Sequence, residues 1–153
     1  MSYDFSIIIP YYNKRYELDL VLMALACQEY NIERFEIIIV DDGSEQNIED
    51  IIVYYQSTYS LVINYIRRPH TGNRGQLRNI GAEQSKAARL IFLDSDMVAE
   101  SSMLKAFAAG QMLGSDNFCS FAGSIFAVDT TTSVMNAIRE DIKVEYFGGS
   151  VAG

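Results

Sequence analysis

The sequence predicts an α/β domain built on a doubly wound, mostly parallel sheet. Four short apolar bursts are spaced through the first two thirds of the chain, at residues 5–9, 35–40, 61–66 and 90–93. They are rich in β-branched residues and nearly continuous, which is typical of strands covered on both faces of a parallel sheet. Helical periodicity fills the segments between them. This alternation of strand and helix indicates three layers, α/β/α, in a single domain over residues 1–153.

Apolar spacing and local start signals predict the helices. Apolar residues recur at helical spacing in two segments, at Leu18, Val21, Leu22 and Leu25 and at Ile48, Ile51, Ile52 and Tyr55. Ser44 is expected to cap the second helix, with Glu45 in its first turn. A third helix is expected over residues 74–87 and a fourth from Ser101 or Ser102. Residues 118–128 suggest one or two strands, and residues 130–144 a helix.

Charge and length restrict the class of function. The 153 residues carry a formal net charge of −8, which argues against nucleic-acid binding because phosphate contacts need a basic face. An acidic protein that binds an anion needs local arginines or a metal ion. The N-terminus shows no secretory signal, the longest uncharged stretch is too short to span a bilayer, and Cys27 and Cys119 have no metal-binding spacing. We therefore expect a cytoplasmic protein without a transmembrane segment in this chain.

Two acidic motifs follow predicted strands, where ligands bind in open parallel sheets. The carboxylate of Asp42, in Asp41-Asp42-Gly43-Ser44, can accept N–H donors from a nucleobase, and the alternative is a simple capping turn. Asp94 and Asp96, separated by Ser95, can share a hard cation such as Mn²⁺ or Mg²⁺ with bound phosphates. The sequence therefore predicts a metal-assisted site for a nucleoside diphosphate.

Two further segments add aromatic and basic groups to this predicted site. In Pro10-Tyr11-Tyr12-Asn13, an aromatic ring after the first strand can stack on a base, or can simply cover the end of the sheet. Arg74, Arg78 and Asn79 lie at the start of the third predicted helix, where positive charge and N–H groups favour anions, although a solvated charged face is the alternative. The one histidine, His70, is interpreted as structural or incidental.

In this order and spacing, the segments SIIIPYYN, EIIIVDDGS, GNRGQLRNIGA and LIFLDSDMV resemble the inverting family 2 glycosyltransferases of GT-A fold. The resemblance covers residues 5–105 and implies binding of a nucleotide-diphospho-sugar, with UDP-sugar the expected donor. It implies that Tyr12 packs on the base, that Asp42 hydrogen-bonds it, and that Asp94 contacts the ribose. Asp96 would hold the metal on the diphosphate. The other donor-binding residues expected are Pro10, Asn13, Arg74, Arg78, Asn79 and Ser95.

The resemblance also implies a general base, because a carboxylate must deprotonate the acceptor hydroxyl. Asp141 comes earlier than the family pattern and is only a weak candidate, with Asp129 a further carboxylate to consider. We place the donor half at residues 1–110 and the start of the acceptor half at 111–153, and expect the rest of that half, with the base, beyond the chain. The expected acceptor is a saccharide or a lipid-linked group, with peripheral membrane association of the full protein.

Two alternatives stay open at the level of sequence. A donor-binding fragment without transferase activity would carry the same motifs but lack the base. A haloacid-dehalogenase-like phosphohydrolase would use Asp94 as nucleophile and Asp96 as acid/base, but that motif belongs after the first strand of its fold, and here three predicted strands precede it.

Overall fold

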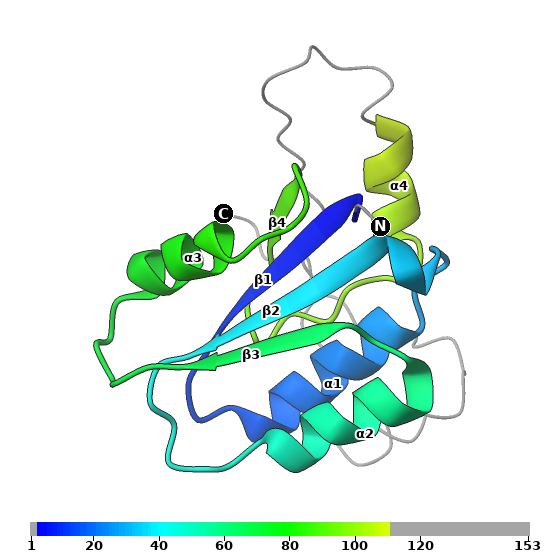
Figure 1. The fold of residues 1–153 in the computed structure, drawn as a ribbon. Helices are drawn as coiled ribbons and strands as arrows, with labels where there is room; N and C mark the ends of the chain where they lie inside the picture. The colour runs from blue at the N-terminus through cyan, green and yellow to red at the C-terminus, as the bar shows by residue number, and fades with distance from the viewer. Residues whose placement is uncertain (1–2, 111–153) are drawn as a thin grey trace, which may run out of the picture.

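The computed structural model describes residues 3–110 and confirms the predicted alternation of strands and helices (Figure 1). The four strands form one parallel sheet in the order β3-β2-β1-β4. Helices α1 and α2 lie on one face of the sheet and α3 on the other, as expected for an α/β domain. The elements are β1 (Phe5–Tyr11), α1 (Arg15–Ala26), the 3₁₀ turn η1 (Ile32–Arg34), β2 (Phe35–Asp41), α2 (Glu49–Tyr59), β3 (Ile63–Arg67), α3 (Arg74–Glu83), β4 (Leu90–Phe92) and α4 (Met103–Gly110).

Successive side chains of β1 and β2 enter two separate apolar layers. The register pairs Ile7 with Ile37 in the large cluster beneath α1 and α2, and Ile8 with Ile38 in the smaller cluster beneath α3. All seven residues of each strand are buried, which confirms the prediction of strands covered on both faces. The edge strand β4 differs, because Leu90 and Phe92 are 40% and 50% exposed. The prediction of a strand covered on both faces is therefore wrong for β4.

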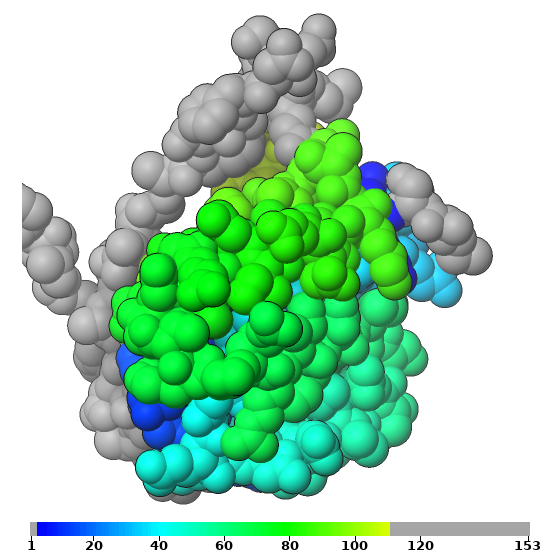
Figure 2. Space-filling model, turned by 60° about the vertical axis from the view of Figure 1, so that its left-hand side comes forward, coloured from blue at the N-terminus to red at the C-terminus, as the bar shows by residue number. Residues whose placement is uncertain are grey.

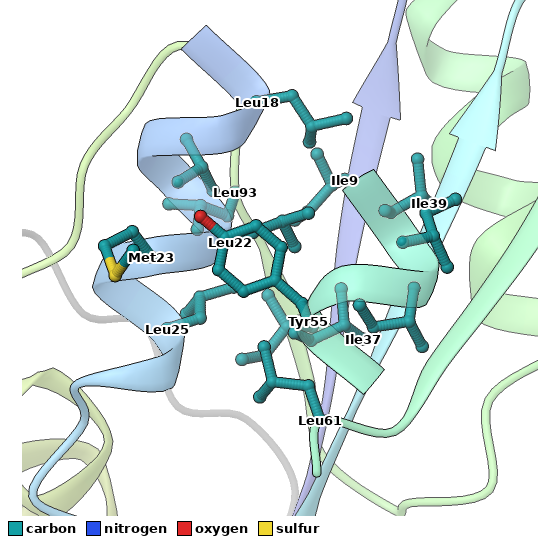
Figure 3. Packing of buried hydrophobic residues seen from close by; sticks show 14 of the residues in the cluster. Ile9, Leu18, Leu22, Met23, Leu25, Ile37, Ile39, Tyr55, Leu61 and Leu93 are labelled. Atoms are coloured by element: carbon teal, nitrogen blue, oxygen red, sulfur yellow. The ribbon is translucent and has the colours of Figure 1, made fainter. Parts of the chain in front are cut away.

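The larger cluster is closed by the two helical stripes that the sequence predicts. Figure 3 shows Leu18, Leu22 and Leu25 of α1 directed toward Ile9 and Ile37 of the sheet, with the ring of Tyr55 from α2 among them. The Tyr55 hydroxyl donates a hydrogen bond to the Asp19 side chain, at 2.7 Å, which ties α2 to α1. These packed stripes hold the strands whose ends carry the polar motifs.

Helix α3 approaches the opposite face of the sheet through a glycine. A Cβ atom on Gly81 would lie 2.4 Å from the Cγ2 atom of Ile8, so no larger residue fits at this helix position without movement. Leu77, one turn earlier, is buried in the same layer. Figure 2 brings the face of the sheet that carries α3 forward, and the green atoms of α3 and its neighbouring segments cover this face. The close contact fixes the position of the arginines at the start of α3.

Two helix boundaries differ from those predicted. Helix α2 begins at Glu49, its N-cap residue is Ile48, and Ser44 does not cap it, because the Ser44 hydroxyl is bonded elsewhere. Helix α3 ends at Glu83 rather than residue 87, since the chain turns at Gln84. Within residues 3–110 no helix has the length and apolar character to cross a bilayer. The strands and helix predicted at 118–128 and 130–144 lie outside the described residues.

Candidate functional site

The loops that follow the parallel strands gather at one edge of the sheet, at the lower left in Figure 1. There Tyr12 follows β1, Asp42 follows β2 and the Asp94-Ser95-Asp96 turn follows β4. The loop after β3 runs past this edge before α3 begins. A crevice outside the carboxyl ends of the strands is where open parallel sheets bind their ligands.

Asp41 and Ser44 join the ends of β1, β2 and β3. The buried Asp41 carboxylate accepts hydrogen bonds from the Ser44 backbone N–H at 2.8 Å, the Ser44 hydroxyl at 2.6 Å and the Tyr65 hydroxyl at 2.6 Å. Burial, together with the bond to Asp41, raises the pKa of the Tyr65 hydroxyl, so it stays a donor. Asn13, at a positive φ, donates its backbone N–H to the Ser44 Oγ and accepts from Glu45 N–H through its side-chain oxygen. The first acid of the motif is therefore structural.

Asp42 binds the loop that follows β3. Its Oδ1 atom accepts hydrogen bonds from the Thr71 backbone N–H at 2.8 Å and the Thr71 hydroxyl at 3.0 Å, and its Oδ2 atom accepts from the Gly72 N–H at 2.8 Å. The side chain is buried, and burial opposes its charge. The hydrogen bonds from Thr71 and Gly72 outweigh that effect, so the pKa of Asp42 is lowered. A charged carboxylate thus lies at the end of β2.

His70 contacts both Asp42 and Tyr12, although sequence reasoning treats it as incidental. Its Nδ1 atom lies 2.9 Å from the Asp42 carbonyl oxygen and 3.0 Å from the Asp42 Oδ2 atom. The imidazole stacks on the Tyr12 ring, with the ring centroids 4.4 Å apart. Gly43 makes room for this loop, because a Cβ atom there would lie 2.8 Å from the His70 backbone nitrogen. No local pattern in the sequence predicts the contact, since it joins segments far apart in the chain.

Pro10 lies within β1, where a proline costs a hydrogen bond if its nitrogen faces a neighbouring strand. The carbonyl of Ile8 accepts from Leu93 N–H on the β4 side, and that of Tyr11 accepts from Asp42 N–H on the β2 side. By alternation Pro10 faces the β4 side, beyond the last paired residue Phe92. The proline therefore ends the β1–β4 ladder without losing a bond.

Helix α3 supplies the basic groups of the site. Its N-cap residue is Asn73, whose side chain accepts a hydrogen bond from Gln76 N–H at 3.1 Å. The guanidinium of Arg78 donates to the Asp94 carboxylate at 2.7 Å, while its Nε atom is buried without a partner among the described residues. Arg74 and Asn79 are exposed on the same helix. The exposed part of the Arg78 guanidinium, near the ends of the strands, can bind an anionic ligand.

The last acid of the Asp94-Ser95-Asp96 turn pairs with a lysine. Lys14, the residue before α1, forms an ion pair with the Asp96 carboxylate. This bond lowers the pKa of Asp96, with a smaller contribution from the charge of Arg74. Ser95 is buried between the two acids. Lys14 is a residue of the site that sequence reasoning missed, although it directly follows the PYYN segment.

The two acids are candidate ligands for a divalent cation that is shared with phosphate, in exchange for their present basic partners. Their side chains are 36% and 43% exposed, and the lowered pKa of Asp96 keeps its carboxylate charged. Within residues 3–110 no cluster of three or more histidine, cysteine or acidic side chains could hold a metal. Water and phosphate oxygens would therefore complete the coordination, as is usual for Mg²⁺ at phosphate sites. The candidate bases Asp129 and Asp141 lie outside the described residues.

Comparison with known protein families gives the class of enzyme to which this fold and these strand-end acids belong. The chain belongs to glycosyl transferase family 2, whose model matches residues 6–141. The chondroitin synthase of Escherichia coli is 30% identical over 157 residues, which cover 95% of this chain and 22% of that protein. Membership in this family rules out the haloacid-dehalogenase-like reading of Asp94 and Asp96.

Solved structures show the same fold. Staphylococcus aureus TarS, residues 1–349, has a TM-score of 0.65 and 30% sequence identity, and covers 69% of this chain and 31% of that chain. It has also been solved with UDP and with UDP-GlcNAc. A mannosyltransferase from Pyrobaculum calidifontis, 15% identical with a TM-score of 0.61, supports the fold alone. This chain spans less than a third of the length of each of these relatives.

Proposed function

We propose that the chain binds a nucleotide-diphospho-sugar, with a UDP-sugar as the preferred donor, for inverting transfer of the sugar to an acceptor hydroxyl. The observation that carries this proposal is the gathering of an exposed aromatic ring, a charged carboxylate and an arginine–aspartate pair at one edge of the sheet. TarS, which shares the fold at 30% identity, has been solved with UDP. We propose that a ligand of the same class binds here at Tyr12, Asp42, Arg78 and Asp94.

Each group has a distinct role in this proposal. The ring of Tyr12 offers a stacking surface for the base, and the Asp42 carboxylate accepts a base N–H. Asp94, oriented by Arg78, contacts the ribose, and the unused Arg78 Nε donor stabilises negative charge nearby. Pro10, Asn13, Arg74, Asn79 and Ser95 line or support the same edge.

A divalent ion, Mn²⁺ or Mg²⁺, would be held by Asp96, with Asp94 acting through water. When bound, the ion would neutralise the diphosphate leaving group. Lys14 has to release Asp96 for this to happen, because a carboxylate that is paired with an ammonium group is not free to ligate a metal. In an acidic chain of net charge −8, this exchange would supply the positive charge that a diphosphate needs.

Calorimetry with UDP, GDP and dTDP, each with Mn²⁺ and with EDTA, tests donor binding. We expect UDP to bind most tightly, and its affinity to fall clearly in EDTA because the anionic diphosphate then meets uncompensated carboxylates. Asp96→Asn should lower the affinity in Mn²⁺ but not in EDTA, where the loss of one negative charge should leave the weak binding equal or slightly tighter. Equal UDP affinity with and without metal would remove Asp96 from its proposed role.

Transfer requires a general base, and every strand-end carboxylate within residues 3–110 already has another partner. We propose that this chain by itself binds donor but transfers little sugar, since a positioned base typically contributes about 10²–10⁴-fold. The measurement is glycosyl transfer from UDP-sugars to a panel of saccharide and lipid-linked acceptors. Efficient transfer would contradict the proposal, and Asp141 and Asp129 would then be the carboxylates to replace first.

The cytoplasmic location of the protein stays a prediction, which cell fractionation would test.

A further inference from the structure

The imidazole of His70 lies in the part of the site proposed for the base. It contacts Tyr12, at the end of β1, by stacking, and Asp42, at the end of β2, through its Nδ1 atom. Both atoms near Nδ1 are acceptors, a carbonyl oxygen and a carboxylate oxygen, so Nδ1 carries the hydrogen and donates. The imidazole thus stacks on Tyr12 and places its N–H between the Asp42 carbonyl oxygen and the carboxylate that is proposed to bind the nucleobase.

The geometry leaves no room for a base between this ring and Tyr12. Centroids 4.4 Å apart mean that the two rings are already in contact, so a third ring cannot enter between them. The Asp42 carboxylate has about four acceptor positions. Thr71 donates twice and Gly72 once, and the His70 Nδ1 atom lies 3.0 Å from the Oδ2 atom, where it occupies the fourth position. A base N–H can reach Asp42 only if one of these donors leaves.

His70 is the donor that can leave most easily. Its side chain is 51% exposed and belongs to no apolar cluster, so removing it from Tyr12 opens no cavity in the core. The Thr71 and Gly72 donors, in contrast, include backbone groups that anchor the loop after β3. The backbone nitrogen of His70 itself is packed against Gly43. The loop can therefore stay in place while the side chain rotates about its own bonds.

We propose that His70 occupies the base position of the ligand-free protein and is displaced when the nucleotide binds. The inference rests on the proposed function. It makes His70 an internal competitor of the donor, which lowers the affinity for nucleotide while keeping Tyr12 and Asp42 covered. It also favours bases that replace both contacts, a flat ring on Tyr12 and an N–H at Asp42, as uracil does with its N3–H.

Two measurements on the untagged chain test the inference. Because His70 is the only histidine, its imidazole signals in a proton NMR spectrum need no further assignment. We expect ring-current shifts from Tyr12 in the free protein, and their loss on saturation with UDP and the diamagnetic ion Mg²⁺. By calorimetry, His70→Ala should bind UDP about tenfold more tightly, the factor that corresponds to one competing hydrogen bond of ordinary net strength. His70→Phe, which keeps a ring but loses the donor, should fall between alanine and wild type.

The outcomes separate this inference from the proposed function. Imidazole signals that keep their shifts in saturating UDP would overturn the inference, and so would a His70→Ala variant that binds UDP equally or more weakly. In either case the His70 ring would hold Tyr12 in position for the base and would not compete with the base. Absence of UDP binding by both the wild type and His70→Ala would overturn the nucleotide site itself. The wild-type spectrum decides the matter even where a variant folds poorly.

Discussion

The close approach of α3 to β1 makes Gly81 a sharp test of the packing that positions Arg78. In Gly81→Ala the new methyl group would lie 2.4 Å from the Ile8 Cγ2 atom and 3.2 Å from its Cγ1 atom. Ile8 is fully buried and β-branched, so it has few alternative rotamers with which to yield. Either α3 moves away from the sheet or the β1 side chain is forced out of its rotamer.

Two opposing effects set the size of the change. Alanine is favoured over glycine within a helix by about 1 kcal/mol. Adding a methyl group to a well-packed core costs about 1–3 kcal/mol. Since the obstructing atom is buried and stiff, we expect overpacking to dominate, with a net loss of up to about 2 kcal/mol in the free energy of unfolding. This loss corresponds to a decrease of up to about 8 °C in Tm for a chain of this size.

Gly75 on the same helix is the matched control. A Cβ atom there would meet only the Asn73 Oδ1 atom, at an ordinary 3.4 Å, so Gly75→Ala should be neutral or stabilising. Urea unfolding of both variants measures the difference. Ile8→Ala removes the obstructing methyl groups, so the double variant with Gly81→Ala should be less destabilised than the sum of the single changes. A Gly81→Ala protein as stable as Gly75→Ala would refute the packing argument.

Two further predictions concern the acidic groups of the site. Lys14→Gln removes the partner of Asp96 and should tighten Mn²⁺ binding without nucleotide by a few-fold, since exposed ion pairs are worth about 0–1 kcal/mol; an unchanged Mn²⁺ affinity in calorimetry would show that Lys14 does not compete. The pKa of Asp42 is lowered on folding, so its carboxylate stabilises the fold above its unfolded value near 3.8, and this contribution is lost as the pH falls through the folded pKa. Urea unfolding between pH 3 and 6 should therefore show a shallower acid loss for Asp42→Asn than for the wild type, and parallel curves would contradict the assignment.

Apolar periodicity predicts most of the architecture, because burial of regular stripes dominates the folding of an α/β domain. The stripes at Leu18 and Ile48 lie where expected in the core cluster. The predicted cap at Ser44 is wrong for a physical reason. Its hydroxyl is engaged by Asp41 and by the Asn13 N–H, which are neighbours only after the strands align. A local capping rule cannot include partners supplied by the sheet.

The same limit applies to the candidate site. The strand-end position of Asp42, Asp94 and Asp96 follows from the order of strands, which the sequence predicts. Their partners do not, because the bonds of Asp42 to Thr71 and of Asp96 to Lys14 span 29 and 82 residues. These contacts depend on loop conformations after β1 and β3, which carry no periodic signal. The sequence therefore gives no sign of a role for His70, whereas in the structure this residue contacts both Tyr12 and Asp42.

The hydrogen bonds that join Asn13, Ser44 and Arg67 have a consequence for how the two sides of this sheet edge respond to salt. These bonds, whose acceptors are all neutral oxygen atoms, link the ends of β1, β2 and β3 into one rigid corner. The end of β4 is joined to the other elements through the partly exposed ion pairs of Asp94 and Asp96. Screening weakens such ion pairs more than it weakens hydrogen bonds to neutral oxygen atoms. Ionic strength should thus loosen the β4 end while the corner keeps its shape, so one side of this sheet edge is preformed and the other is adjustable.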